Sequence, residues 1–204
     1  MKKTLTEIKF EKIVKEGFHE ILKPLGFKKK SNNFYIQRQG IGQIINIQKS
    51  TWYSRDHNKF TINTGLFLPE YWSGLTYHQG KELPTFPTEL DCIIRKRIGE
   101  LRNQLDTWYD VDESTVENEL IFEMRTNLEI YILPFFDRTK TKEALLDLMD
   151  TEILGLLPLG KLVVYGELKQ FDRAKKEYEN ILSEKTNPEF LKILKEYGHK
   201  YGLD

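Results

Sequence analysis

The spacing of apolar residues changes along this chain, and that change restricts the fold more than any single motif does. Between residues 5 and 25 apolar side chains recur every three or four positions, with Lys and Glu between them. This spacing is typical of an amphipathic helix. Pro24 and Gly26 predict where the helix ends, because proline removes a backbone donor and glycine suits a left-handed cap.

From residue 33 apolar and polar residues alternate, and β-branched and aromatic residues are frequent. A period of two with this composition is typical of strands that are buried on one face. The sequence therefore predicts an antiparallel meander whose apolar face is covered by the first helix. Its three strands are residues 33–39, 41–52 and 59–68.

The second half of the chain returns to helical spacing, in about five segments. Ser114 and Glu117 predict a capping box at the start of the first of these. Asn187 and Pro188 are placed to begin the last helix, and Gly202 to follow its end. The predicted helices are residues 114–134, 141–157, 161–169, 172–183 and 187–201.

Two segments between these halves are ambiguous. Residues 69–91 contain three prolines and two glycines without clear periodicity, so they form a functional loop or an element that the pattern does not identify. Residues 93–105 fit a short helix or a strand leading into one. We predict an α+β fold with a helix packed on the meander in residues 1–112, followed by an all-helical unit in residues 113–204 packed on it.

Charge and composition restrict the class of function. The 31 basic and 31 acidic side chains cancel, which argues against a general nucleic-acid or membrane-surface binder. The single cysteine and a charged N-terminus without an apolar signal segment predict a cytoplasmic protein. No apolar run approaches the ~18 residues that cross a bilayer. Scarce alanine beside abundant Lys, Ile and Asn suggests a bacterial source.

Motifs for metals, cofactors and nucleophiles are missing from the sequence. The four histidines are scattered, and no ligand pair of the HExxH kind accompanies them. Cys92 stands beside Ile93 and Ile94, which predicts a small buried hydrophobe rather than a nucleophile. The sequence therefore predicts no metal and no cofactor.

The polar face of the meander is the main candidate site. Strand alternation places Asn46, Gln48 and Ser50 on one face, with Thr61 and Asn63 on the same face of the next strand. Amides and hydroxyls donate and accept hydrogen bonds without ionising, which suits a polar ligand or peptide. The same pattern is also that of the solvated side of an antiparallel sheet.

Charged and aromatic residues flank this face in the sequence. Lys49, Trp52, Tyr53, Trp108 and Tyr109 supply side chains of types enriched in binding sites. Arg95, Lys96, Arg97 and Arg102 form a basic cluster that an ion-pair network with Glu100 or Asp106 would also explain. Lys28, Lys29 and Lys30 predict a solvated turn, with phosphate contact as the alternative. The candidate binding residues are Asn46, Gln48, Lys49, Ser50, Trp52, Asn63, Arg95, Arg97 and Trp108.

Several motifs in order resemble one protein family. LKPLGFKKKSNNFYIQRQG, IINIQKSTW, KFTINTGLFLPE, RKRIGEL and DTWYDVD together resemble the bacterial family called domain of unknown function 4304, over about the first 112 residues. The resemblance implies a common fold and brings no catalytic roles to transfer. The matching positions are Gly26, Phe27, Asn46, Gln48, Ser50, Asn63, Gly65, Arg97, Gly99 and Trp108.

Two classes of function fit these observations. The first is a non-catalytic binding module for a protein or a small polar ligand, of which an immunity-like protein is one form. The second is a hydrolase or phosphate-acting enzyme that uses Arg95, Arg97 and Lys49 with carboxylates such as Asp106 or Asp110. A concave pocket containing a carboxylate with a strongly shifted pKa would favour the enzyme, and a flat face would favour the binding module. The sequence makes no prediction of oligomeric state.

Overall fold

The computed structural model describes residues 2–51, 54–151, 158–184 and 187–203. Contacts divide the chain into two compact units, Met1–Phe67 with Phe86–Leu145 and Leu68–Thr85 with Leu146–Asp204. Each unit is described by itself. Residues 113–145 belong to the unit that contains the sheet, and the segment Leu68–Thr85 packs with the last helices, so this division does not fall after residue 112. No helix in the described ranges is long and apolar enough to cross a membrane.

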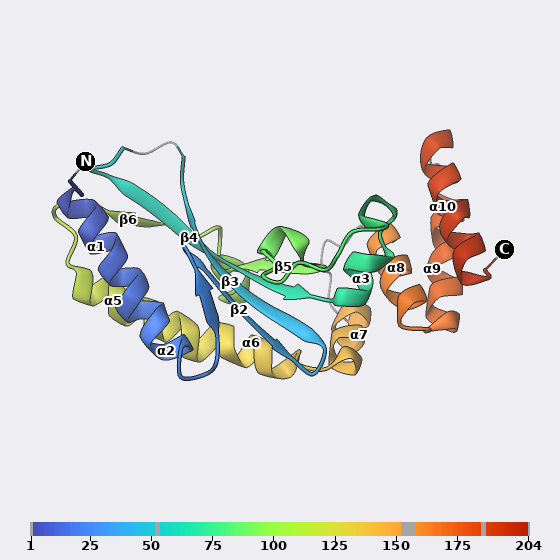
Figure 1. Cartoon of the computed structure of the whole chain (residues 1–204), viewed down its shortest axis with the longest axis horizontal. Coiled ribbons are helices and arrows are strands. Elements are labelled where there is room, and N and C mark those ends of the chain that lie inside the picture. Colours follow the sequence, from blue (N-terminus) through green and yellow to red (C-terminus); the bar gives the residue numbers. More distant parts are fainter. Residues whose placement is uncertain (1, 52–53, 152–157, 185–186, 204) are drawn as a thin grey trace. The chain divides into compact units, whose positions relative to one another are not determined.

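The first unit contains an antiparallel sheet with the order β1-β2-β3-β4-β5, in which β6 also pairs with β4 (Figure 1). The strands are β1 Lys28–Lys30, β2 Asn33–Arg38, β3 Ile41–Lys49, β4 Asn58–Phe67, β5 Ile94–Arg97 and β6 Tyr109–Val111. The meander β2-β3-β4 and the α+β class are confirmed. β1 and β6 were not predicted, because three residues are too few to show a period of two.

Helices cover one face of this sheet (Figure 1). Phe34 pairs with Ile45, and Ile47 pairs with Ile62, so these buried side chains lie on the same face. Phe10 meets Phe60 edge to face, with ring centroids 5.4 Å apart. The covering elements are α1 Leu5–Val14, the π-helix η1 Lys15–His19, α2 Glu20–Leu22, α5 Glu117–Thr126, the π-helix η4 Asn127–Ile132 and α6 Leu133–Arg138.

The predicted capping box before α5 is wrong. Ser114 donates from its backbone N–H (2.8 Å) and its hydroxyl (2.7 Å) to Oδ1 of Asp112, so it forms a turn instead of a cap. The helix begins at Glu117, and Val116 at the N-cap position makes no side-chain bond. Asp112 therefore competes for the serine, and the capping-box pattern does not include a residue at that position.

Gly17 allows η1 to lie close to α5. A Cβ at Gly17 would lie 2.9 Å from Cβ of Met124, a side-chain atom that cannot rotate away. We expect Gly17→Ala to lower the free energy of unfolding by about 2 kcal/mol despite the higher helix propensity of alanine. Urea denaturation would measure this. Lys15→Ala, at an exposed position of the same π-helix, should change the stability by less than about 0.5 kcal/mol, and equal effects of the two variants would contradict the packing argument.

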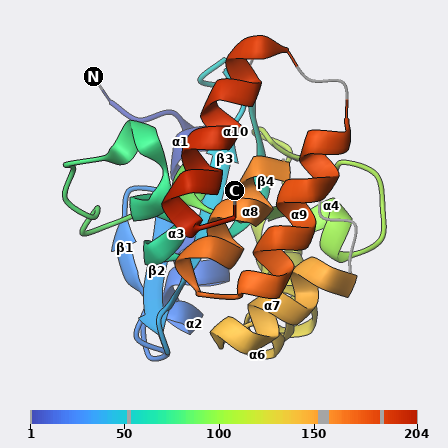
Figure 2. The ribbon, with the colours of Figure 1, turned by 90° about the vertical axis from the view of Figure 1, so that its right-hand side faces the viewer.

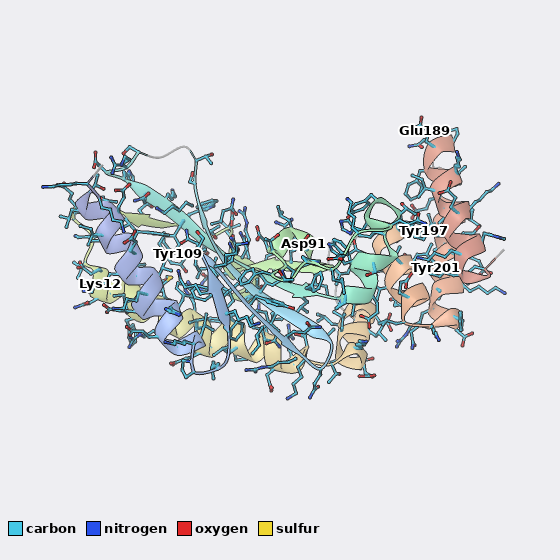
Figure 3. All side chains as sticks on the ribbon, viewed as in Figure 1. Lys12, Asp91, Tyr109, Glu189, Tyr197 and Tyr201 are labelled. Atoms are coloured by element: carbon cyan, nitrogen blue, oxygen red, sulfur yellow. The ribbon has the colours of Figure 1, made fainter. Side chains whose placement is uncertain are left out.

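The second unit consists of helices (Figure 2). The segment 69–91 is not simply a loop, because it starts with α3, a helix that the sequence pattern did not identify. Thr76 donates its backbone N–H to Tyr197 Oη at 2.9 Å, and Tyr201 Oη donates to Glu167 at 3.0 Å; both tyrosines are labelled in Figure 3. The described helices are α3 Pro69–Gly74, η2 Thr76–His78, α8 Pro158–Glu167, α9 Phe171–Ser183 and α10 Pro188–Tyr201.

The ends of α10 agree with the prediction. Asn187 caps the helix by accepting from the backbone N–H of Phe190 at 2.8 Å, and Gly202 is left-handed with φ 65°. Three further helical elements lie in the described part of the chain. They are η3 Glu89–Asp91 and α4 Ile98–Leu101 in the first unit, and α7 Lys142–Thr151, which contains the division between the units.

Candidate functional site

The face of the sheet opposite the helices carries a straight row of polar side chains across five strands. In the strand register Lys30 pairs with Asn33, Asn33 with Asn46, Asn46 with Asn63, and Asn63 with Arg97. Paired residues point to the same side of a sheet, so the five side chains lie on one face. We call these five residues the polar row. It has three asparagines in the middle and a cation at each end.

Tight turns set the register of this row. Gln39 and Gly40 connect β2 to β3 with positive φ angles of 49° and 84°, as a type I′ turn requires. This two-residue turn places Asn33 opposite Asn46. Ser31, with φ 53°, lies in the turn between β1 and β2, which brings Lys30 beside Asn33. Slipping any of these pairs by one residue would move a polar side chain to the helix-covered face.

Amide hydrogen bonds connect the row and run in one direction. Asn63 Nδ2 donates to Asn46 Oδ1 at 3.0 Å and to Gln48 Oε1 at 2.8 Å, and Asn46 Nδ2 donates to Asn33 Oδ1 at 2.8 Å. Asn63 is only 4% exposed, whereas Asn33, Asn46 and Gln48 are partly exposed. Within the described ranges, the NH₂ groups of Asn33 and Gln48 donate to no side chain or carbonyl. The exposed part of this face therefore presents hydrogen-bond donors.

The segment between β5 and β6 fixes the position of Arg97 at its end of the row. Arg97 forms an ion pair with Asp106, whose Oδ2 also accepts from Trp108 Nε1 at 2.9 Å. The guanidinium carbon of Arg97 lies 5.4 Å from the centroid of the Trp108 ring. Thr61 donates its hydroxyl to the carbonyl of Thr107 at 2.7 Å. Asp106 is one of the two carboxylates expected to balance the basic cluster.

A small open pocket of about 180 Å³ lies at this end of the row. Its lining consists of Asn63, Arg95, Lys96, Arg97 and Glu100. Glu100 uses Oε2 to accept the backbone N–H of Arg97 at 2.7 Å. Arg95 is exposed and forms no ion pair with any residue that the structure describes. A pocket of this size admits a carboxylate or a side-chain end rather than a whole ligand.

The structure brings some candidate residues together and separates others. Asn46, Gln48, Asn63, Arg97 and Trp108 lie on or beside the polar row, and Arg95 lines its pocket. Ser50 follows β3 and donates its backbone N–H to the carbonyl of Lys59 at 2.7 Å. Trp52 and Tyr53 lie outside the described residues.

Lys49 lies on the opposite, helix-covered face. Its Nζ is 4.1 Å from the centroid of the Phe10 ring, and its strand partner Phe60 is fully buried against the same ring. Strand alternation requires this, because Lys49 stands between two residues of the polar face. Lys49 is therefore no part of the site.

Cys92 and Asp110 are two further residues that the sequence singles out, and neither belongs to the polar row. Cys92 is 8% exposed, and burial raises the pKa of its thiol well above the usual value, which keeps it protonated at neutral pH. Asp110 Oδ1 lies 2.8 Å from His57 Nε2, and its Oδ2 lies 3.7 Å from Lys59 Nζ. In the part of the chain that the structure describes, no three His, Cys, Asp or Glu side chains are grouped to hold a metal ion.

Sequence reasoning missed Lys30 and Asn33. The sequence predicts a solvated turn for Lys30, because a basic run in a chain without net charge is usually exposed to solvent. The sequence predicts Asn33 to be the first residue of a strand and indicates no partner for it. A two-residue turn at Gln39-Gly40 fixes the register of the two strands that it connects, and this register pairs Asn33 with Asn46. No comparable signal predicts the pairing of Lys30.

Together these features define an α+β protein with an antiparallel sheet, helices on one face and a polar row on the other. The family model for the domain of unknown function DUF4304 matches residues 18–138, and the chain belongs to this family. The match confirms the resemblance and extends beyond residue 112 to the end of α6. Neither the curated proteins nor the solved structures include a match to this chain.

Proposed function

We propose that this chain is a bacterial, cytoplasmic binding module whose polar row takes an acidic, extended segment of a partner protein. The direction of the amide hydrogen bonds carries the proposal. Asn63 donates to Asn46 and Gln48, and Asn46 donates to Asn33, so the NH₂ groups of Asn33 and Gln48 remain for a ligand. Groups that only donate require an acceptor. The negatively charged acceptors among protein side chains are the carboxylates of Asp and Glu.

Charge at the two ends of the row supports the same partner. Lys30 is exposed and, like Arg95, has no ion-pair partner among the described residues. Arg97 is already balanced by Asp106. The unbalanced charge on this face is therefore positive at both ends, which attracts a segment with several carboxylates.

The length of the row fits a short extended segment. Four strand-to-strand steps separate Lys30 from Arg97, which corresponds to ~19 Å at the usual spacing of about 4.8 Å. A segment of six extended residues reaches about 20 Å. Exposed ion pairs contribute at most about 1 kcal/mol each, so we expect weak, salt-dependent binding to any such segment by itself.

The alternative enzyme has less support from the geometry. A hydrolase or phosphate-acting enzyme at Arg95 and Arg97 needs a carboxylate that is available to move a proton. Asp106 accepts from Arg97 and Trp108, and Glu100 accepts from the backbone of Arg97. Both carboxylates therefore act as positioning groups for Arg97.

A titration with a blocked hexaglutamate peptide tests the proposed function. We expect the peptide to shift the NMR resonances of the side-chain amides of Asn33, Asn46 and Gln48 in the labelled full-length chain. The shifts should disappear at about 0.5 M salt, where the Debye length is ~4 Å. Blocked hexaglutamine is the neutral control and should leave these resonances unchanged. Shifts confined to other basic surfaces, or equal shifts with both peptides, would overturn the proposal.

A further inference from the structure

A larger pocket lies on the helix-covered side of β1, away from the polar row. It has a volume of about 370 Å³ and is formed by α1 and η1 together with the turn between β1 and β2. Pockets that hold small molecules usually have volumes of about 300–1,000 Å³, so this pocket is in that range and the pocket at Arg95 is below it. Lys29 lines it, although the run of three lysines to which it belongs predicts a solvated turn.

Local backbone geometry forms both walls. On the helix side the backbone N–H of Glu20 bonds to the carbonyl of Lys15, five residues back, which widens the helix by one residue. Lys15 and His19 are the first and last residues of this π-helix, and both line the pocket. On the sheet side Lys29 pairs with Phe34, so its side chain lies on the helix-covered face, opposite to Lys30.

The floor of the pocket is apolar. Phe10 is 2% exposed and Val14 is 4% exposed, and both belong to the buried face of α1. The ring of His19 lies beside Phe34, with centroids 6.3 Å apart. An apolar body placed on this floor would lose contact with water on the side that faces Phe10 and Val14.

The mouth of the pocket is positively charged. Lys15 and Lys29 are exposed, and neither forms an ion pair with another residue of the described ranges. Among the described residues of the lining Glu11 alone is acidic, and it is balanced by Lys3 at 2.6 Å. The lysines at the mouth are therefore available to an anion from solution.

We propose that this pocket binds a small amphipathic anion, with its apolar body on Phe10 and Val14 and its carboxylate or phosphate at Lys15 and Lys29. The proposal does not depend on the function of the polar row, because the two sites use opposite faces of β1. It gives a role to Lys29, which the binding of an acidic segment at the polar row does not use.

NMR titrations of the full-length chain with octanoate, octyl phosphate, 1-octanol and acetate test this site. We expect saturable shifts of the backbone amides of Val14, Lys15, Ser31 and Asn32 with octanoate or octyl phosphate. The tighter of these two probes identifies the head group. 1-Octanol should bind much more weakly, and acetate should cause no saturable shift. Equal binding of octanol and octanoate, or shifts spread over the whole chain, would overturn the proposal.

Two adjacent lysines provide a matched pair of variants. Lys29→Gln should weaken binding of the preferred anion about fivefold, the effect of one exposed charge pair. Lys30→Gln removes the same charge from the opposite face and should leave the affinity unchanged. Both positions are exposed, so thermal unfolding should show both variants to be folded. Equal loss of affinity in the two variants would show that only the overall charge matters, and would exclude the site.

Discussion

Replacing Gly99 with alanine is expected to lower the free energy of unfolding by about 3 kcal/mol. A Cβ at this position would lie 2.2 Å from the carbonyl oxygen of Leu105 and 3.0 Å from its carbonyl carbon. These are backbone atoms, so the clash cannot be relieved by a change of rotamer. The segment that carries Asp106 and Thr107 would have to move, and the ion pair to Arg97 would move with it.

The Gly99→Ala variant has a control at the residue that it would contact. Leu105 is 91% exposed, so Leu105→Ala leaves the backbone in place and should change the stability by less than about 0.5 kcal/mol. Urea denaturation measures both variants, and the indole N–H resonance of Trp108 reports whether the segment has moved. A Gly99→Ala variant with wild-type stability and an unchanged Trp108 resonance would contradict the described geometry.

Asn63→Leu is expected to cost about 2 kcal/mol, because it removes the central donor of the polar row. Asn63 is 4% exposed and donates to both Asn46 and Gln48. Leucine has the same branched shape and no donor, so two amide oxygens would lose their partner next to an apolar group. Thermal and urea unfolding measure the loss.

Gln48→Leu is the matched control for Asn63→Leu. Gln48 is partly exposed and only accepts in this network, and Asn63 keeps its bond to Asn46 when Gln48 is replaced. The expected loss is below about 1 kcal/mol. Equal losses at the two positions would show that the row is a set of separate surface pairs and not a connected network.

The sequence predicted the parts of the fold that local spacing determines. The first helix, the strands β2, β3 and β4, and the last helix with its caps all follow from periodicity and end signals, as does the common face of Asn46, Gln48 and Asn63. The same alternation excludes Lys49 from that face, so its place among the candidate binding residues is wrong. The prediction that the first helix covers the apolar face is also confirmed, because the same alternation determines which face is apolar.

The polar row could be predicted only in part, because it depends on pairing between distant segments. Asn63 and Arg97 are paired residues of strands that are 26 residues apart at their closest ends, and residues 68–85 between them belong to the other unit. Nothing in the local spacing of Lys28 to Lys30 indicates a strand. The small size of Gly99 is visible in the sequence, but its contact with the carbonyl of Leu105 is not.

The affinity of two lysine variants for the blocked hexaglutamate peptide tests the central claim most directly. Lys30 lies at the end of the polar row, and Lys29, one residue away, lies on the opposite face. The proposed function predicts that Lys30→Gln weakens binding about fivefold and that Lys29→Gln leaves it unchanged. Equal affinities of the two variants would contradict the claim that the polar row is the binding surface.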